Sequence, residues 1–557
     1  GNSDVYIVSS SGGEVKRLTY HPGNDISVGW SPDSKRVLFN TGRNNAPRGW
    51  QRLYTIDRDG GNPTLLPMNR AYSGSYSPDG KQLVFRRAGF WDKGWRNYRG
   101  GQNQALRVIK LDDMEEYDLP FDNDFDIEPN WQGDDIYYLS NQSKVTNVFK
   151  YSTSSKQVSQ VTQAKKFDVM GYTVDGNNLV YEYHGDLYLQ AGNSAPQKLT
   201  INVQGDFYWA RNKYVNAEEH LTEFDVSPNA KRAVFAARGD IFTVPVEHGS
   251  PRNLTDSSAS RQTSPAWSHD GQSIAWFSDD SGEYRLNIAD QRGEIAKEIK
   301  LAEKGVYSEL HWSPDNKRLI FRDNFQQLWI ANAENGSTKI IDQNTITHPE
   351  PSAMASWSPD SKWVAYTKQT NNMFRQLFIY SVDERKNYTV TEGIAEVRSP
   401  VWDKNGERLY FLASIDYGPK AAWLDMSTIA FNPKFQVYYA LLTRKHDSPL
   451  LEKSDEEEAV TDSKEEKSSK DGDADEEKSA VTVAIDFNDL TKRVLPLSKE
   501  SGHFSQLQAG KSGELFYLSQ FNNNSGETKT DLIRYQLEKR ELKTIASDID
   551  SYKLSSN

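Results

Sequence analysis

Residues 311 to 321 read HWSPDNKRLIF, and this phrase returns in altered form along the whole chain. The clearest other copies are GWSPDSKRVLF (29–39), SYSPDGKQLVF (75–85), AWSHDGQSIAW (266–276) and SWSPDSKWVAY (356–366). Looser copies are NWQGDDIYYL (130–139), GYTVDGNNLVY (171–181), FDVSPNAKRAVF (224–235), VWDKNGERLYF (401–411) and LQAGKSGELFYL (507–518). Trp267, Trp312, Trp357 and Trp402 follow one another at intervals of 45 residues. A period of this length with four strand-like segments per unit is typical of β-propeller blades.

Each part of the phrase has a physical role. Ser-Pro-Asp followed by Gly, Ser or Asn predicts a turn, because Pro presets φ, Asp bonds back to the backbone, and Gly or Asn tolerates a left-handed conformation. The apolar residues after the turn alternate as a half-buried strand does. A further strand follows, and Leu-Thr or Val-Thr closes many units, as at 18–19 and 254–255. We expect the large aromatic residue before each turn to pack between neighbouring blades.

Ten such hairpins are too many for one ring, since propellers usually have four to eight blades. The rhythm breaks near residues 205–222, where polar and helix-compatible residues intervene. We therefore predict an all-β protein with two tandem β-propellers, the first over residues 1–212 and the second over 213–557. The chain begins in a third strand and ends in a turn, so we expect both rings to be incomplete in this chain.

Acidic charge is concentrated in one segment. Residues 452–478 carry 13 acidic and 5 basic side chains, in a chain whose net charge is −12. Almost no apolar residue is present there, so we expect a disordered insertion over about 446–480, between strand-like flanks. Calcium binding by this segment is the less common alternative. The rest of the chain is near neutral with no basic face, so nucleic acid is not an expected partner.

Cysteine is absent, which excludes disulfides, thiolate nucleophiles and cysteine-based metal sites. No run of 18 apolar residues is present, so no membrane span is predicted. The residues at the start resemble the interior of a strand, so the lack of a signal peptide is not informative.

Few motifs carry chemistry. There is no Gly-x-Ser-x-Gly elbow, no His-Glu-x-x-His and no Gly-rich nucleotide loop, and the nine histidines are scattered. DNDFDIE (122–128) places acids at alternate positions but lacks the Gly and the final Glu of a calcium loop. We predict no catalytic residue, no metal and no cofactor in this chain.

One excursion interrupts a blade of the first ring. Residues 86–108, RRAGFWDKGWRNYRGGQNQALRV, combine basic and aromatic side chains beside a Gly-Gly pair. Loops on a rigid scaffold often carry function, and packing between domains is an equal alternative.

Four stretches resemble bacterial tricorn-like proteases. They are residues 227–286, which begin SPNAKRAVF, YRGG (98–101), AFNPKFQVYYALL (430–442) and AIDFNDLTKRVLPL (484–497). The resemblance covers essentially the whole chain. It implies a six-bladed first propeller and a seven-bladed second propeller, which gate or channel peptide substrates. It also implies a serine peptidase whose catalytic and PDZ domains follow this chain as partners, and a possible homo-oligomer.

The resemblance also directs attention to basic residues. An archaeal relative anchors the substrate's C-terminal carboxylate with neighbouring arginines in the first propeller. The matching loop here, TYHPGNDISVGW (19–30), has no arginine. Candidate substitutes, chosen by charge, are Arg43, Arg48, Arg96 and Arg99, with Tyr98 as a neighbouring substrate contact.

Two other functions use similar repeats. TolB-like propellers dock protein partners without catalysis, but a single ring would favour that alternative. A prolyl-oligopeptidase-type hydrolase needs one ring and a nucleophile elbow. We expect the protein to be periplasmic or secreted, with a cytoplasmic location as the alternative.

Overall fold

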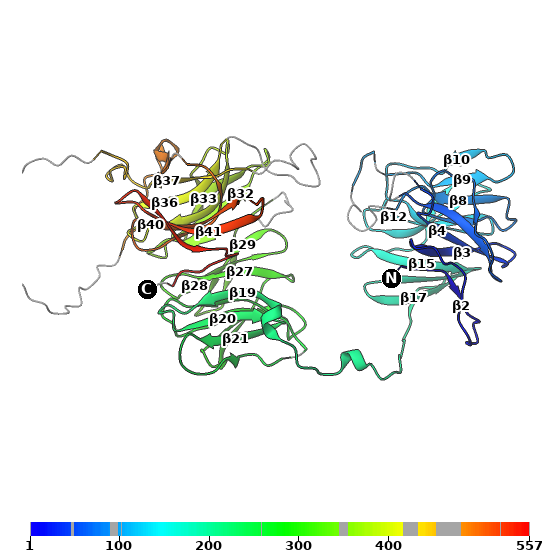
Figure 1. Cartoon of the computed structure of the whole chain (residues 1–557), viewed down its shortest axis with the longest axis horizontal. Helices are drawn as coiled ribbons and strands as arrows, with labels where there is room; N and C mark the ends of the chain where they lie inside the picture. Colours follow the sequence, from blue (N-terminus) through cyan, green and yellow to red (C-terminus); the bar gives the residue numbers. More distant parts are fainter. Residues whose placement is uncertain are drawn as a thin grey trace, which may run out of the picture. The chain divides into compact units, whose positions relative to one another are not determined.

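The computed structural model describes residues 2–45, 50–89, 98–101, 103–257, 259–344, 355–415, 433–452, 481–498, 500–523 and 525–555. The chain divides into two compact units, Gly1–Arg211 and Asn212–Asn557 (Figure 1). The described residues form β-strands and short 3-10 turns, without an α-helix among them. The predicted all-β class is confirmed.

The first unit holds one two-stranded sheet and four four-stranded sheets within its described residues. The two-stranded sheet is β1 (Tyr6–Ile7) and β2 (Lys16–Arg17). The four-stranded sheets are β3 (Asp25–Trp30), β4 (Arg36–Thr41), β5 (Arg52–Asp57), β6 (Thr64–Leu65); β7 (Ser73–Tyr76), β8 (Gln82–Arg86), β9 (Arg107–Lys110), β10 (Glu116–Asp118); β11 (Ile127–Gln132), β12 (Asp135–Ser140), β13 (Asn147–Ser152), β14 (Val158–Gln160); and β15 (Val169–Asp175), β16 (Asn178–Tyr183), β17 (Asp186–Ala191), β18 (Gln197–Lys198).

The second unit holds six four-stranded sheets within its described residues. The first three are β19 (Leu221–Val226), β20 (Arg232–Ala237), β21 (Asp240–Pro245), β22 (Arg252–Asn253); β23 (Gln262–Trp267), β24 (Ile274–Ser278), β25 (Arg285–Ala289), β26 (Ile295–Lys300); and β27 (Tyr307–Trp312), β28 (Arg318–Asp323), β29 (Gln327–Asn332), β30 (Thr338–Gln343). The last three are β31 (Ala355–Trp357), β32 (Trp363–Gln369), β33 (Arg375–Ser381), β34 (Lys386–Thr389); β35 (Glu396–Trp402), β36 (Arg408–Ser414), β37 (Gln436–Leu441), β38 (Val494–Pro496); and β39 (His503–Ala509), β40 (Glu514–Asn522), β41 (Thr528–Gln536), β42 (Glu541–Ser547).

Every sheet is an antiparallel meander in chain order. First strands of successive sheets lie against each other, as β3, β7, β11 and β15 do in the first unit and β19, β23 and β27 do in the second. The first strand of each sheet is therefore the innermost, which is the arrangement of propeller blades. The ten predicted hairpins all form, one in each four-stranded sheet. The totals of six and seven blades stay predictions.

The repeated turn has one hydrogen-bond pattern. In the 313–318 copy, the Ser313 hydroxyl donates to Asp315 Oδ1 at 2.5 Å and accepts from the Arg318 amide at 2.9 Å. Asn316 takes the left-handed conformation, at φ 57°. The same serine-to-aspartate bond, at 2.6 Å, forms in the copies beginning at Ser31, Ser77, Ser268 and Ser358. The turn was predicted with Gly or Asn at the left-handed position, and Ser34 and Ser361 also occupy it.

Side chains of the repeat join neighbouring sheets. Trp312 Nε1 donates to the Ala266 carbonyl at 3.2 Å, and Trp402 Nε1 donates to the Ser356 carbonyl at 3.1 Å. The predicted packing of these aromatic residues between blades is confirmed at both positions. Left-handed turn residues add a second link, because the Ser361 hydroxyl accepts from the amide of Asp315 in the preceding sheet at 2.9 Å.

The closing threonine joins the third and fourth strands of a sheet. Thr255 Oγ1 accepts from the Ile241 amide at 3.1 Å and donates to Asp240 Oδ1 at 2.8 Å. Thr162 similarly accepts from the Val148 amide at 2.9 Å. This explains why Leu-Thr or Val-Thr closes many of the repeats.

Two irregular segments match the interruptions in the sequence. Near the boundary of the two units lie the 3-10 turns η1 (Tyr208–Ala210) and η2 (Ala217–His220). In the fifth sheet of the second unit, β37 pairs with β38 although more than fifty residues separate them, a span that includes a third turn, η4 (Leu490–Arg493). The acidic segment falls in this insertion, and its residues 453–480 lie outside the described residues.

The Trp312 bond predicts a difference between two tryptophans of the same repeat. Trp312→Phe removes the donor to Ala266, and we expect a loss of stability about 1 kcal/mol larger than in Trp357→Phe, because a buried hydrogen bond contributes about that amount. Trp357 is buried too, but its Nε1 has no hydrogen-bond partner among the described residues. Urea denaturation measures the free energy of unfolding of the second unit in both variants. Equal losses would show that the indole hydrogen bond contributes nothing.

Candidate functional site

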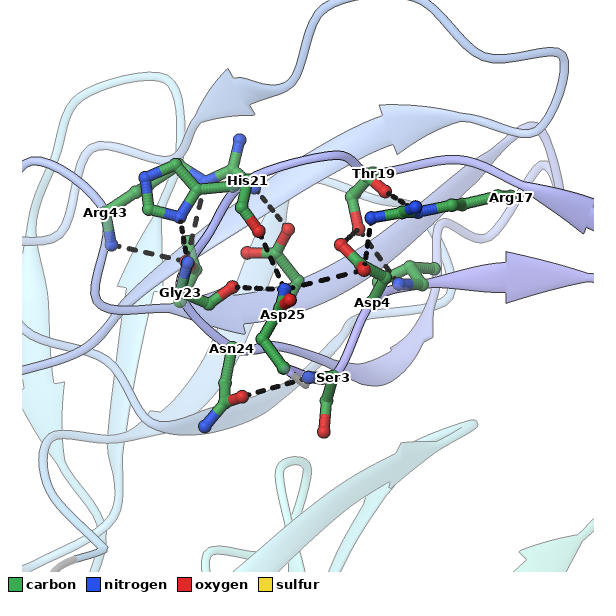
Figure 2. A network of polar contacts seen from close by, with 12 residues as sticks. Ser3, Asp4, Arg17, Thr19, His21, Gly23, Asn24, Asp25 and Arg43 are labelled. Carbon is green, nitrogen blue, oxygen red and sulfur yellow. Dashed lines mark hydrogen bonds and ion pairs between the residues drawn. The ribbon is translucent and has the colours of Figure 1, made fainter.

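Arg43 lies within a blade of the first unit. It follows β4, and its Nη2 forms an ion pair with the Asp25 carboxylate at the start of β3 (Figure 2). The Arg43 side chain is 11% exposed and that of Asp25 is fully buried. The guanidinium carbon also lies 5.3 Å from the centre of the Phe39 ring and 5.5 Å from that of Tyr54. Arg43 therefore compensates a buried charge.

The loop before Asp25 is tied to the first residues of the chain (Figure 2). Asn2 Nδ2 donates to the His21 carbonyl at 2.8 Å, and the Ser3 amide donates to Asn24 Oδ1 at 2.9 Å. The Gly23 amide donates to His21 Nδ1 at 2.9 Å, so the neutral ring carries its proton on Nε2. These bonds hold the loop that presents Asp25 to Arg43.

The YRGG stretch is fastened to the acidic loop 122–128. Arg99 Nη2 lies 3.2 Å from Asp124 Oδ1, and the Gly100 amide donates to Asn123 Oδ1 at 3.3 Å. Asn103 Nδ2 donates to the Asn123 carbonyl at 2.8 Å and to the Tyr98 carbonyl at 2.7 Å. The Arg99 side chain is 40% exposed, so a solvent-borne ligand can reach it.

The two described arginines among the predicted residues, Arg43 and Arg99, do not share one site. Arg43 and Arg99 use separate carboxylates, Asp25 and Asp124, which belong to different parts of the first unit. Arg48 and Arg96 lie outside the described residues.

Asp126 is a buried carboxyl within the acidic loop 122–128. It is 5% exposed, and its Oδ1 has no hydrogen-bond partner among the described residues. Burial raises the pKa of Asp126 to about 7, although a hydrogen bond with Ser140 and the charges of Arg86 and Arg99 act in the opposite direction. Nearby Asp124 raises it further. Asp126 thus changes its charge near neutral pH.

Sequence reasoning missed a set of charged residues on the inner strands of the second unit. Glu309 on β27 forms an ion pair with Arg322 at 3.2 Å, and burial raises the pKa of Glu309 to about 7. On β35 the buried Glu396 pairs with Arg375 and also lies 3.3 Å from Arg398 Nε.

A β-bulge places Glu309 and the equivalent residues of two other sheets. Ser264, Glu309 and Ser399 lie three residues before a repeat tryptophan, at φ between 50° and 56°. The strand register shifts at each of these positions. A bulge redirects a side chain within a strand. The 45-residue spacing was the signal that could have aligned these positions.

Metal chemistry has no evident centre in the described part of the chain. Within those ranges, no group of three or more histidine, aspartate or glutamate side chains is arranged to hold a metal ion. The candidate residues are arginines, carboxylates and amides, which recognise the charges and the peptide units of a ligand.

No helix among the described residues has both the length and the apolar character that crossing a bilayer requires.

The two sets of four-stranded antiparallel sheets, whose first strands lie against each other, define a tandem β-propeller protein. Residues 1–195 match the model of the tricorn protease N-terminal β-propeller domain, and residues 221–557 match that of the tricorn protease second β-propeller domain. The chain therefore belongs to the tricorn protease family, and the predicted family is confirmed. The TolB-like alternative is not favoured, because two different tricorn domains match in order.

Known relatives match the chain from end to end. Tricorn protease homolog 1 of Streptomyces coelicolor is 24% identical, over all of this chain and 53% of its own length. The tricorn protease of Thermoplasma acidophilum is 19% identical, over all of this chain and 50% of its own length. A crystal structure of the tricorn protease matches with a TM-score of 0.58 at 17% identity, covering the whole chain and 53% of that structure. The chain spans about half the length of these relatives.

Replacing Arg43 tests whether it compensates Asp25. We expect Arg43→Gln to lower the free energy of unfolding of the first unit by about 3–5 kcal/mol, because Asp25 is left buried and unpaired. The control Arg107→Gln breaks only a surface pair with Glu116 and Asp118, worth about 1 kcal/mol or less. Differential scanning calorimetry of both variants measures the two losses in the free energy of unfolding. Similar losses would mean that the buried pair stabilises the fold no more than a surface pair does.

The raised pKa of Asp126 predicts that the stability of the fold depends on pH. Its folded pKa lies above the unfolded value of 3.8, so the folded chain binds the extra proton between about pH 4 and 7. The stability from this group is complete below pH 4 and is lost as the pH rises through 7, by at most about 1.4 kcal/mol per pH unit. Asp126→Asn removes this loss.

The measurement is the difference in unfolding midpoint between Asp126→Asn and the unmodified chain from pH 5 to pH 8. We expect the advantage of the variant to grow with pH. Asp113→Asn, at an exposed turn, should show no such trend. A difference for Asp126→Asn that is constant with pH would contradict a raised pKa.

Proposed function

We propose that the two propellers select and admit peptide substrates for a serine peptidase whose catalytic and PDZ domains belong to the same parent protein. The observation that carries this proposal is the ordered match of both tricorn propeller domains along a chain that spans about half of its relatives. The remaining half of such a protein supplies the chemistry. A homo-oligomeric assembly and a periplasmic or secreted location belong to the same proposal, with the cytoplasm as the alternative location.

Arg99 is the basic candidate best placed to meet a peptide carboxylate. Its guanidinium is solvent-accessible, pairs with the Asp124 carboxylate through Nη2 and donates to the Tyr98 carbonyl through Nη1, so its other N–H groups can bind another acceptor. Tyr98 lies next to it on the same fastened stretch. Arg43 contributes indirectly, because it holds Asp25 and the loop of residues 19–30. Arg48 and Arg96 remain candidates by charge.

Hydrolysis of a fluorogenic peptide panel tests the proposal. The 557-residue chain, the remaining half of its parent protein, and their mixture are compared on peptides of increasing length. We expect the chain alone to be inactive and the mixture to differ from the catalytic half in its preference for length. An inhibitor that modifies reactive serines should abolish the activity.

The variant Arg99→Gln tests whether Arg99 binds the peptide carboxylate, and Arg107→Gln is the matched surface control. Loss of a charge-assisted hydrogen bond predicts a KM for free-carboxylate peptides about tenfold higher, with amidated peptides unaffected. Peptide hydrolysis by the repurified chain alone would contradict the proposal that catalysis belongs to the remaining half of the parent protein. Identical length preference with and without the chain would contradict gating.

A further inference from the structure

Two exposed arginines of the first unit have no carboxylate that balances their charge. Arg70 lies in the connection between β6 and β7, and Arg87 follows β8 directly. Neither guanidinium forms an ion pair with a carboxylate of the described residues. Other arginines of the same unit do have such a partner, as Arg43, Arg99 and Arg107 show. The pair of Arg70 and Arg87 is therefore an uncompensated positive charge.

The two guanidinium groups are close enough to repel each other. Loss of hydration lowers the pKa of Arg70, and the charge of Arg87 lowers this pKa further. No carboxylate of the described residues raises it again. Because an arginine stays protonated in proteins, the repulsion is not relieved by loss of a proton. An anion bound between the two groups would relieve it.

The backbone beside Arg70 is fastened to both neighbouring sheets. The Ala71 amide donates to the Gln51 carbonyl, at the start of β5, at 3.1 Å. The Tyr72 amide donates to the Arg86 carbonyl, at the end of β8, at 2.7 Å. The backbone segments that carry the two arginines of the pair are thus held together.

Trp50 orients one of the two guanidinium groups. The guanidinium of Arg70 lies over the ring of Trp50, which is itself half-buried. Such a cation–π contact uses the flat face of the guanidinium and leaves the N–H groups at its edge for an acceptor. Arg70 is therefore a cation with a defined orientation and unused donors.

A phosphate group fits this pair better than a carboxylate does. A phosphate monoester carries about two negative charges and three acceptor oxygens, so it can accept from both guanidinium groups. A carboxylate has one charge and two oxygens, which a single guanidinium binds in the bidentate geometry. We propose that Arg70 and Arg87 bind a phosphate group, and that Trp50 holds the guanidinium of Arg70 in place. This inference goes beyond the proposed function, because it requires neither a peptide nor hydrolysis.

Titration calorimetry of the 557-residue chain with phenyl phosphate tests the site, and benzoate is the matched carboxylate. We expect saturable binding of phenyl phosphate, about tenfold or more tighter than that of benzoate. Binding should tighten from pH 5 to pH 7, because the second pKa of a phosphate monoester lies at about 6 while the arginines stay charged.

Substitutions at the pair test the assignment of each residue. Arg70→Gln and Arg87→Gln should each weaken the binding of phenyl phosphate about tenfold, since each removes a charge-assisted hydrogen bond. Arg70→Lys keeps the charge without the planar donors, so its affinity should fall between those of Arg70→Gln and the unmodified chain. Trp50→Leu should weaken the binding in the unmodified chain and have no effect in Arg70→Gln, because Trp50 acts through Arg70.

Arg58→Gln is the matched control. Arg58 is exposed and follows β5, at the end of the strand away from Gln51. Its replacement should leave the affinity for phenyl phosphate unchanged. An unchanged unfolding midpoint without ligand verifies that each variant is folded.

Sedimentation with phosphatidylcholine vesicles, with and without phosphatidic acid, distinguishes the two sources of a phosphate group. Binding of phenyl phosphate alone supports a soluble ester. Binding of phenyl phosphate and of phosphatidic acid vesicles, both lost in Arg70→Gln, supports a lipid headgroup. Equal affinity for phenyl phosphate and benzoate, no binding of phenyl phosphate at millimolar concentration, or equal binding by Arg70→Gln and Arg58→Gln would overturn the proposal.

Discussion

Every four-stranded sheet in this chain has two faces to bury, and a single sheet cannot bury them by itself. The apolar clusters accordingly mix residues of consecutive sheets, such as Phe277 of β24 with Phe321 of β28, and Leu412 of β36 with Leu515 of β40. The Trp312 indole and the Ser361 hydroxyl add directional bonds across the same boundaries. Stability therefore depends on contacts between neighbouring sheets, as in other repeat architectures.

The hairpins could be predicted because their determinants are local. Serine, aspartate and the residue after it satisfy the turn within six residues, so each copy of the phrase reports its own structure. The bulges of the inner strands could not be predicted in this way. Ser264, Glu309 and Ser399 share a backbone conformation that their side chains do not favour, so the conformation is imposed by the surrounding sheets.

The candidate site was less predictable than the fold, because the charge of an arginine does not reveal which carboxylate it pairs with. Arg43 was chosen by its charge alone, but the pairing of β3 with β4 brings it to Asp25, eighteen residues earlier. Arg99 kept an accessible position because its partner, Asp124, lies in an adjacent loop. The network of Glu396 with Arg375 and Arg398 joins two different sheets, which no local pattern contains.

The bulges of the inner strands separate backbone geometry from side-chain chemistry. Ser264, Glu309, Ser399 and, in the last sheet, Gln506 stand at such a bulge with φ between 50° and 56°. The scaffold thus offers equivalent positions in several sheets, at which the side chain differs while the backbone conformation is kept. Diversification of such a protein requires only single substitutions at these positions, while the sheets that carry them stay the same.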